Sequence, residues 1–262
     1  MKPAFFVAIC ALVAMPGLPQ TYRQPKPRAQ ASISTAFGDN ILTQIADGGG
    51  WQSTITLVNL RNQTATSTVT CYTDNGALYQ WQGIGNNNSV QGTIDALSSL
   101  QIRTEGSASA LTQGWCDVEA PNGSDVAASA IFRYIPTGQE VSVLAQPWDA
   151  SSLILPFDNT GGYRYGVALA DAPPSVYTGE PNDTVSALIY DQSGNQIGSG
   201  AFSIAPQGHM VFMLDQQFPA VVGQRGTVVF SISGFGTLAG LGLRAAPSGA
   251  LTSVSLYEPM SY

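Results

Sequence analysis

The chain has 262 residues, of which 17 are acidic and ten are lysine or arginine, giving a formal net charge of −7. Four of the ten basic residues precede Ser32 and all 17 acidic residues follow it, which leaves six arginines and a net charge of −11 for the remainder. A segment this acidic repels phosphate groups, so the composition argues against nucleic acid and anionic membranes as partners.

The segment 1–31 has the features of a secretory signal peptide followed by an unstructured stretch. Lys2 supplies the positive charge, residues 4–15 form an apolar stretch too short to span a bilayer, and Ala29-Gln30-Ala31 is a cleavage pattern. The residues between are rich in Pro and Gln, which disfavours folding. We therefore expect export to the cell surface or medium with no transmembrane anchor after cleavage; an uncleaved anchor is the alternative.

Short motifs of the first half recur in the second half in the same order. Gly50-Trp51 recurs as Gly162-Tyr163, and Gly76 recurs as Gly194, at nearly the same separation along the chain. A nearly constant separation indicates an internal duplication. We predict one repeat at residues 40–146 and a second at 152–258, each long enough to bury a core of its own.

Alternating apolar and polar residues, typical of half-buried strands, dominate both repeats. In the first repeat we expect strands at 54–59, 66–72, 97–104, 114–119, 126–134 and 141–145. In the second repeat we expect them at 165–170, 185–190, 196–204, 209–214, 227–233, 238–244 and 251–257. No segment favours a helix. The predicted fold class is all-β, with two tandem antiparallel immunoglobulin-like β-sandwiches.

Two cysteines remain after the signal peptide, which contains Cys10. An even pair in an exported chain indicates a disulfide, here between Cys71 and Cys116. The repeat aligns them with Ile189 and Val228, so we expect both to be buried on strands. Closing a loop of about 45 residues would stabilise the first sandwich by about 4 kcal/mol. Free buried thiols are the alternative.

Three segments resemble a family of secreted bacterial proteins of acidobacterial type. They are 45–51 (Ile-Ala-Asp-Gly-Gly-Gly-Trp), 155–169 (beginning Leu-Pro-Phe-Asp-Asn-Thr-Gly-Gly-Tyr) and 225–230 (Arg-Gly-Thr-Val-Val-Phe). The resemblance covers roughly residues 40–258 and implies tandem immunoglobulin-like modules. The family has no assigned function, so the resemblance implies no catalytic residues. The Pro-rich insertion at 172–181 departs from the family's pattern.

The chain has few residues suited to catalysis, and we predict that it is not an enzyme. His209 is its only histidine, and no lysine follows the signal peptide. We expect His209 to be exposed at the edge of a turn, so that its replacement changes nothing in a non-enzyme. Two sets of carboxylates have the chemistry for glycoside hydrolysis, with solvated surface positions as the alternative: Asp117 with Glu119, and Asp171 with Glu180 and Asp183.

Two loops have the composition of a weak calcium site. Asp47 precedes three glycines and Trp51, and Asp158-Asn159 precede Thr160, two glycines and Tyr163. Oxygen-rich, flexible loops suit Ca²⁺. The alternative is a tight turn in which the aspartate accepts hydrogen bonds from the backbone. We predict no cofactor apart from this calcium.

Arg133 and Arg244 occupy matching places before Pro136 and Pro247 in the two repeats. A carboxylate-binding role is one interpretation. We favour a structural role, in which each arginine fixes the turn at a strand end.

Aromatic and amide side chains near loops are the best candidates for ligand recognition. Sugar rings pack on flat aromatic surfaces, and Tyr79 and Trp81 would share one face of a strand. Packing in the core is the alternative. The candidate ligand-binding residues are Tyr79, Trp81, Asn86, Asn87 and Trp148.

The sequence therefore favours a non-catalytic, secreted or cell-surface binding module for polysaccharide or a protein partner. The alternative is a structural spacer or a subunit of an extracellular assembly, joined through exposed sheet edges. A periplasmic chaperone, which needs a basic cleft, and a hydrolase are less favoured. No particular oligomeric state is predicted.

Overall fold

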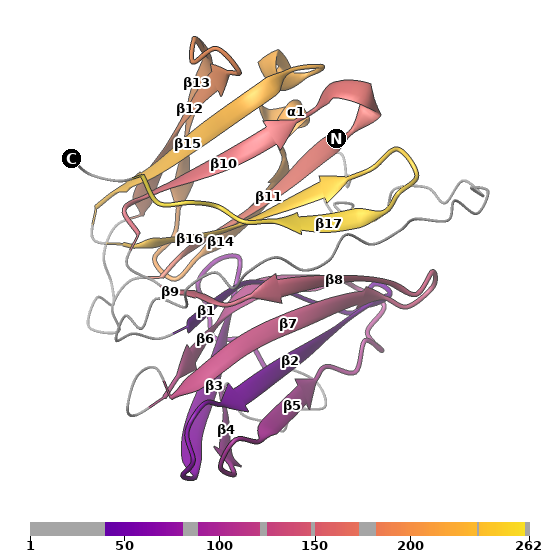
Figure 1. The fold of residues 1–262 in the computed structure, drawn as a ribbon, viewed down its shortest axis with the longest axis vertical. Coiled ribbons are helices and arrows are strands. Elements are labelled where there is room, and N and C mark those ends of the chain that lie inside the picture. The colour runs from indigo at the N-terminus through magenta and orange to yellow at the C-terminus, as the bar shows by residue number, and fades with distance from the viewer. Residues whose placement is uncertain are drawn as a thin grey trace.

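A computed structural model describes residues 40–80, 89–120, 125–147, 150–172, 182–234 and 236–259. These residues form four antiparallel sheets, and none of the four contains strands from both halves of the chain. The sheets pack in pairs, giving two β-sandwiches that lie one above the other in Figure 1. The all-β sandwich fold is as predicted. No helix in the described ranges is long and apolar enough to cross a bilayer.

The first sandwich pairs a sheet of order β4-β3-β6-β1-β9 with one of order β5-β2-β7-β8. Its strands are β1 (Asn40–Asp47), β2 (Trp51–Asn59), β3 (Ala65–Thr73), β4 (Ser89–Ile94), β5 (Ser99–Arg103), β6 (Thr112–Glu119), β7 (Val126–Tyr134), β8 (Gln139–Leu144) and β9 (Gln146–Pro147). The alternation predicted for β2 and β3 is present, because Ile55, Leu57, Val69 and Cys71 are all buried in the core.

The second sandwich pairs a sheet of order β10-β15-β12-β13 with one of order β14-β11-β16-β17. Its strands are β10 (Ser152–Asp158), β11 (Arg164–Asp171), β12 (Asp183–Asp191), β13 (Gln196–Ile204), β14 (His209–Met213), β15 (Arg225–Ser233), β16 (Leu238–Ala245) and β17 (Leu251–Val254). Short helical turns are η1 (Thr160–Gly162), α1 (Leu214–Gln217) and η2 (Pro219–Val221). A second core fills this sandwich, and Phe230 is its largest fully buried side chain.

Both sandwiches keep the central strand pairs of the immunoglobulin fold and change its edges. In that fold the second strand lies beside the fifth and the third beside the sixth. The corresponding pairs here are β2 with β5, β3 with β6, β11 with β14 and β12 with β15. The first strand of each sandwich, β1 or β10, pairs with the sixth strand. The seventh strand, β7 or β16, pairs with the second.

The strand registers of the two sandwiches agree at the β2–β7 and β11–β16 pairs and at the β3–β6 and β12–β15 pairs. Asn59 lies opposite Val126 as Asp171 lies opposite Leu238, so both partners are displaced along the chain by the same amount. Cys71 faces Cys116 as Ile189 faces Val228, with the separations that the repeated sequence motifs also show. One topology and one register are what a duplicated unit would give; the duplication itself stays a prediction.

Strands β1, β4, β9 and β10 and the helix α1 were not predicted. Seven consecutive residues of β1, from Ile41 to Asp47, are buried, so this strand lacks the alternation that marks a half-exposed strand. Gln146 and Pro147, expected to connect the two repeats, instead form β9 and pair with β1.

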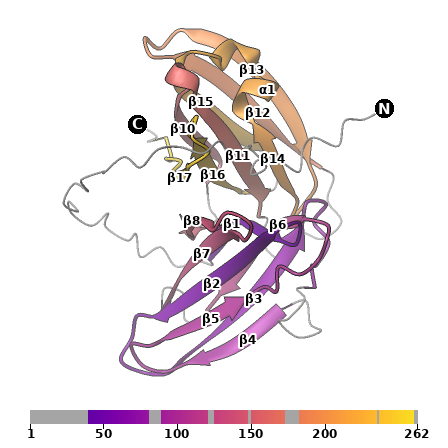
Figure 2. The same cartoon turned by 90° about the vertical axis from the view of Figure 1, so that its right-hand side faces the viewer.

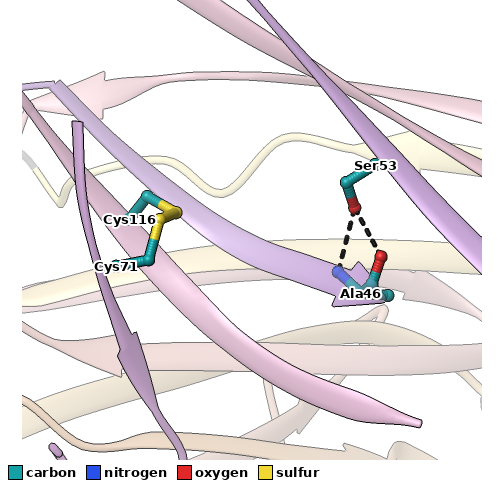
Figure 3. The surroundings of a disulfide bond; sticks show 4 residues. All are labelled: Ala46, Ser53, Cys71 and Cys116. Carbon is teal, nitrogen blue, oxygen red and sulfur yellow. Dashed lines mark hydrogen bonds between the residues drawn. A yellow bond between two sulfur atoms is a disulfide. The ribbon is translucent and has the colours of Figure 1, made fainter. Parts of the chain in front are cut away.

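The predicted disulfide is present between Cys71 and Cys116 (Figure 3). It joins the adjacent strands β3 and β6 of one sheet, where the two residues are direct partners. A second link lies nearby. The Ser53 hydroxyl donates to the Ala46 carbonyl at 2.7 Å and accepts the Ala46 N–H at 3.0 Å. This buried pair connects β2 to β1 and therefore joins the two sheets of the first sandwich.

We expect the double substitution Cys71→Val with Cys116→Val to lower the free energy of unfolding by about 2–4 kcal/mol, because the cross-link restricts the unfolded chain. Valine keeps both positions apolar, as in the second sandwich. Urea denaturation followed by tryptophan fluorescence measures the change. A thiol reductant should lower the stability of the wild type and leave the variant unaffected; equal stability of both proteins would contradict the prediction.

Candidate functional site

The two sandwiches meet through a sheet that is buried on both faces. On β11, Val167 and Leu169 point into the core of the second sandwich, whereas Ala168 and Ala170 point outward and are also buried. Figure 2 shows β11 and β16 above β1 and β6 of the first sandwich. The corresponding outward face of β2 carries Thr54, Thr56 and Val58, which remain partly or fully exposed. The outward face of the second copy has therefore become an interface.

Small residues on the second sandwich allow this close approach. Ile41 and Trp115 of the first sandwich pack against Ala170 and Ala239, and all four are at most 3% exposed. Leu241 and Leu243, also on the outward face of β16, extend the core of the first sandwich. The two modules thus share one continuous apolar contact, which fixes their relative position.

Polar contacts at one end of this contact correct the prediction for His209. Its side chain is fully buried, with Nδ1 placed 2.8 Å from Oδ1 of Asp74 in the other sandwich. The His209 N–H also donates to the Asp74 carbonyl at 3.1 Å. Trp115 Nε1 donates to the Gln207 carbonyl at 2.8 Å. His209 is therefore a junction residue and not an exposed turn residue.

The hairpin turn that carries Asp74 fits against the second sandwich only because it contains Gly76. This glycine has φ +79°, and a Cβ atom there would lie 2.2 Å from the Pro206 carbonyl oxygen. A side chain at this position would push the turn away from the second sandwich. The Asp74-Asn75-Gly76 turn is thus also a docking element.

Figure 1 shows the edge strands β8 and β17 facing each other across the seam. A groove is lined by residues of both strands. It has a volume of about 450 Å³ and is lined by residues 142–146, Leu241 and residues 253–256. None of these lining residues is charged. Leu144, one of the lining residues, is 73% exposed, which is unusual for a leucine. No backbone hydrogen bond joins β8 to β17 in the part of the chain that the structure describes.

A second cavity lies inside the seam, between residues such as Trp51, Phe132 and Val167. Its volume of about 20 Å³ has room for a water-sized molecule only. The seam cavity is therefore a packing gap and not a ligand site.

The structure gives little support to the predicted aromatic platform. Tyr79 is partly buried and packs against the first core, and its N–H donates to the Cys71 carbonyl. Burial raises the pKa of its hydroxyl. Trp81, Asn86, Asn87 and Trp148 lie outside the described residues. Tyr79 thus behaves as the alternative interpretation expected, as part of the core.

The two predicted calcium loops use their carboxylates within the protein. Asp47 is buried, and its Oδ1 accepts the Gly106 N–H at 2.8 Å. Asp158 Oδ1 accepts the N–H of Thr160 at 3.0 Å, and Oδ2 accepts from Arg225 Nε at the same distance. Asn159 is buried, and its Nδ2 donates to the Val221 carbonyl. This geometry favours the turn-capping alternative for both loops.

Strand register separates the two arginines that the motifs equate. Arg244 has the register position of Phe132, whereas Arg133 has that of Ala245. A shift of one residue moves a side chain to the other face of a sheet. Arg244 accordingly lies over the Tyr163 ring, 3.6 Å from its centroid. Arg133 is exposed, with Nε 3.8 Å from Glu140 Oε1. The equivalence of Arg133 and Arg244 is therefore wrong by one residue.

Of the predicted carboxylate sets, only Asp171 and Asp183 form a buried pair. Burial, with a smaller contribution from the charge of Asp183, raises the pKa of Asp171 to about 8. Glu180 lies outside the described residues. Asp117 and Glu119 sit on β6, where Glu119 is exposed. Within the described residues, no group of three or more Asp, Glu, His or Cys side chains lies together.

No protein-family model, no curated protein and no solved structure matches the chain. The resemblance to secreted bacterial sandwich proteins therefore stays a prediction, and the case for a function depends on the geometry of the chain itself.

We expect His209→Ala to lower the free energy of unfolding by about 1–3 kcal/mol, because it removes a buried side chain and its contact across the seam. Asp74→Ala should cost less, since the Asp74 side chain is 61% exposed. Urea denaturation measures both. Wild-type stability of His209→Ala would contradict the placement of this residue at the junction.

A pH effect is expected from Asp158, whose pKa is lowered from 3.8 to about 2, chiefly by the hydrogen bond from the Thr160 hydroxyl. The unfolded carboxylate gains its proton near pH 4 and the folded one only near pH 2, so its stabilising contribution is complete above pH 4 and lost as the pH falls to 2. Because the side chain is 34% exposed, the contribution should be below about 1 kcal/mol.

Urea denaturation at pH 4, 3 and 2 tests this expectation. Asp158→Asn should lose less stability than the wild type over this interval, and Thr160→Val should lie between them. Identical pH profiles for the wild type and Asp158→Asn would refute it.

Proposed function

We propose that this protein is a non-catalytic binding module that holds an extended segment of a protein partner in the groove between β8 and β17. The proposal depends on one observation. Two edge strands, one from each sandwich and each unpaired along its outer side, face each other at an uncharged groove. Export to the cell surface or medium, expected from the N-terminal residues, is part of the same proposal.

Edge strands favour this type of ligand because their backbone groups are unpaired on one side. An extended peptide adds to such an edge through main-chain hydrogen bonds, and pockets for alternate side chains give specificity. The groove volume of about 450 Å³ lies within the range of ligand sites. Its lining of serines and aliphatic residues suits a peptide with alternating small polar and apolar residues.

The continuous contact between the sandwiches supports binding by setting the width of the groove. Gln139 Nε2 donates to the Gly249 carbonyl at 2.6 Å, which ties the β7–β8 turn to the β16–β17 turn at one end. The Gly240 N–H donates to Gln146 Oε1 at 3.1 Å, close to the other end. A preformed groove avoids part of the ordering cost of association.

Polysaccharide binding is the weaker candidate. It requires flat aromatic side chains exposed beside polar groups, and the described aromatic side chains nearest to that role are Tyr79, which is partly buried, and Tyr257, which is 60% exposed. A spacer role uses the same stiff connection but gives no account of the exposed Leu144 beside the groove. We therefore place the protein partner first.

Selection from a displayed library of random ten-residue peptides tests the proposal on the full chain. We expect enriched peptides with alternating apolar residues that bind at one saturable site. Leu144→Lys should weaken binding at least about tenfold, because it places a charge beside an uncharged groove. Leu97→Lys is the matched control, since Leu97 is 71% exposed on a turn that does not line the groove.

Backbone methylation distinguishes strand addition from binding through side chains alone. Two sets of peptides carry methyl groups on the odd-numbered or on the even-numbered backbone nitrogens. Only one of the two sets should lose binding, because only alternate amides face the edge strand. Equal binding to wild type and Leu144→Lys would contradict the proposal. Saturable binding to a glycan panel, with no enriched peptide, would instead favour polysaccharide.

A further inference from the structure

A buried carboxylate at the end of β11 has a second carboxylate as its hydrogen-bonding neighbour. Asp171 is 0% exposed and contacts the Asp183 carboxyl, and among the described residues neither of its side-chain oxygens accepts a hydrogen bond from an N–H group or a hydroxyl. Leaving a polar group in this state is costly, and more so for a group that carries charge. Among the described residues, only a proton shared with Asp183 is available to either oxygen.

A second carboxylate converges on the same place. Asp183, the first residue of β12, is 8% exposed, and its Oδ2 accepts the Gly236 N–H at 2.8 Å. A Cβ atom placed on Gly236 would lie 1.9 Å from Asp171 Oδ1 and 2.5 Å from Asp183 Oδ2. A Cβ atom on Gly234 would lie 1.7 Å from Asp183 Oδ1. Two glycines thus leave the space around the paired carboxylates free of side chains.

The described residues provide no positive charge for this pair. The described residues include no lysine, and no ion pair among them involves Asp171 or Asp183. Each arginine has another contact: Arg61 with Asp125, Arg103 with Thr54, Arg133 with Glu140, Arg164 with Asp215, Arg225 with Asp158 and Arg244 with Tyr163.

The first sandwich shows how the same position is satisfied by protein alone. Asn59 has the register position of Asp171 and is also buried. Its Nδ2 contacts the carbonyls of Gln63, Ile94 and Asp95 at 2.7–3.0 Å, and its Oδ1 accepts the Arg61 N–H at 2.9 Å. A neutral amide closes this site completely. Among the described residues, the acid in the second sandwich has no such set of partners.

From this geometry we propose that Asp171 and Asp183 form a calcium site that joins the end of β11 to the start of β12. Carboxylate oxygens are the preferred ligands of Ca²⁺, which also accepts backbone carbonyls and water to complete its coordination. One shared proton would satisfy a single oxygen of Asp171, whereas a cation can contact both. Calcium fits better than Mg²⁺, which demands regular octahedral geometry and keeps several waters. This site is separate from the Asp47 and Asp158 loops.

Calorimetric titration of the metal-free full chain with calcium chloride is the first test. We expect one saturable site in the wild type and none in Asp171→Asn or Asp183→Asn. The matched control is Asp158→Asn, which changes an aspartate already engaged by Thr160 and Arg225 and should keep the site. Titration with magnesium chloride should give much weaker binding.

Thermal melting separates loss of binding from loss of folding. Calcium at about a hundred times its Kd should raise the melting temperature of the wild type by about 5 °C or more. Asp171→Asn should melt cooperatively without responding to calcium, because it removes the buried charge and not the fold. Binding retained in both asparagine variants, or no saturable calcium binding by the wild type, would overturn the proposal.

Discussion

Burial of the outward face of the β14-β11-β16-β17 sheet is the feature that organises the whole molecule. This sheet packs against the core of its own sandwich on one side and against the first sandwich on the other. Alanines at positions 168, 170 and 239 keep that outward face flat enough for Ile41 and Trp115 to reach it. Removing the first sandwich would expose a row of apolar residues to water, so the two modules stabilise each other.

The same contact brings together elements that neither sandwich could place alone. Edge strands β8 and β17 face each other because the sheets behind them are fixed, and the gap between them becomes a groove of defined width. An exposed edge is normally a liability that proteins protect with charge or proline. Here the groove lining is uncharged and Leu144 is exposed beside it. In our proposal these features serve the recognition of an extended chain.

Comparison of the two sandwiches shows where they differ. Register equates Asn59 with Asp171 and Cys71 with Ile189. The first sandwich gains a disulfide and satisfies its buried polar position with an amide. In the second sandwich, Ile189 and Val228 pack together where the first has its disulfide, and Asp171 stands where the first has Asn59. In our proposal a calcium ion bound by Asp171 and Asp183 links β11 to β12 in the second sandwich.

The all-β class, the Cys71–Cys116 bond and most strands could be predicted from the sequence, because alternation and cysteine pairing are local patterns that burial on one face imposes. Strand β1 could not, since it is buried on both faces and loses that alternation. His209 was misplaced for a different reason, since it lies against the other sandwich, where its contact with Asp74 joins residues 135 positions apart. The seam, the groove and the convergence of Asp171 with Asp183 emerge only from the folded chain, because each joins residues that are distant in the sequence.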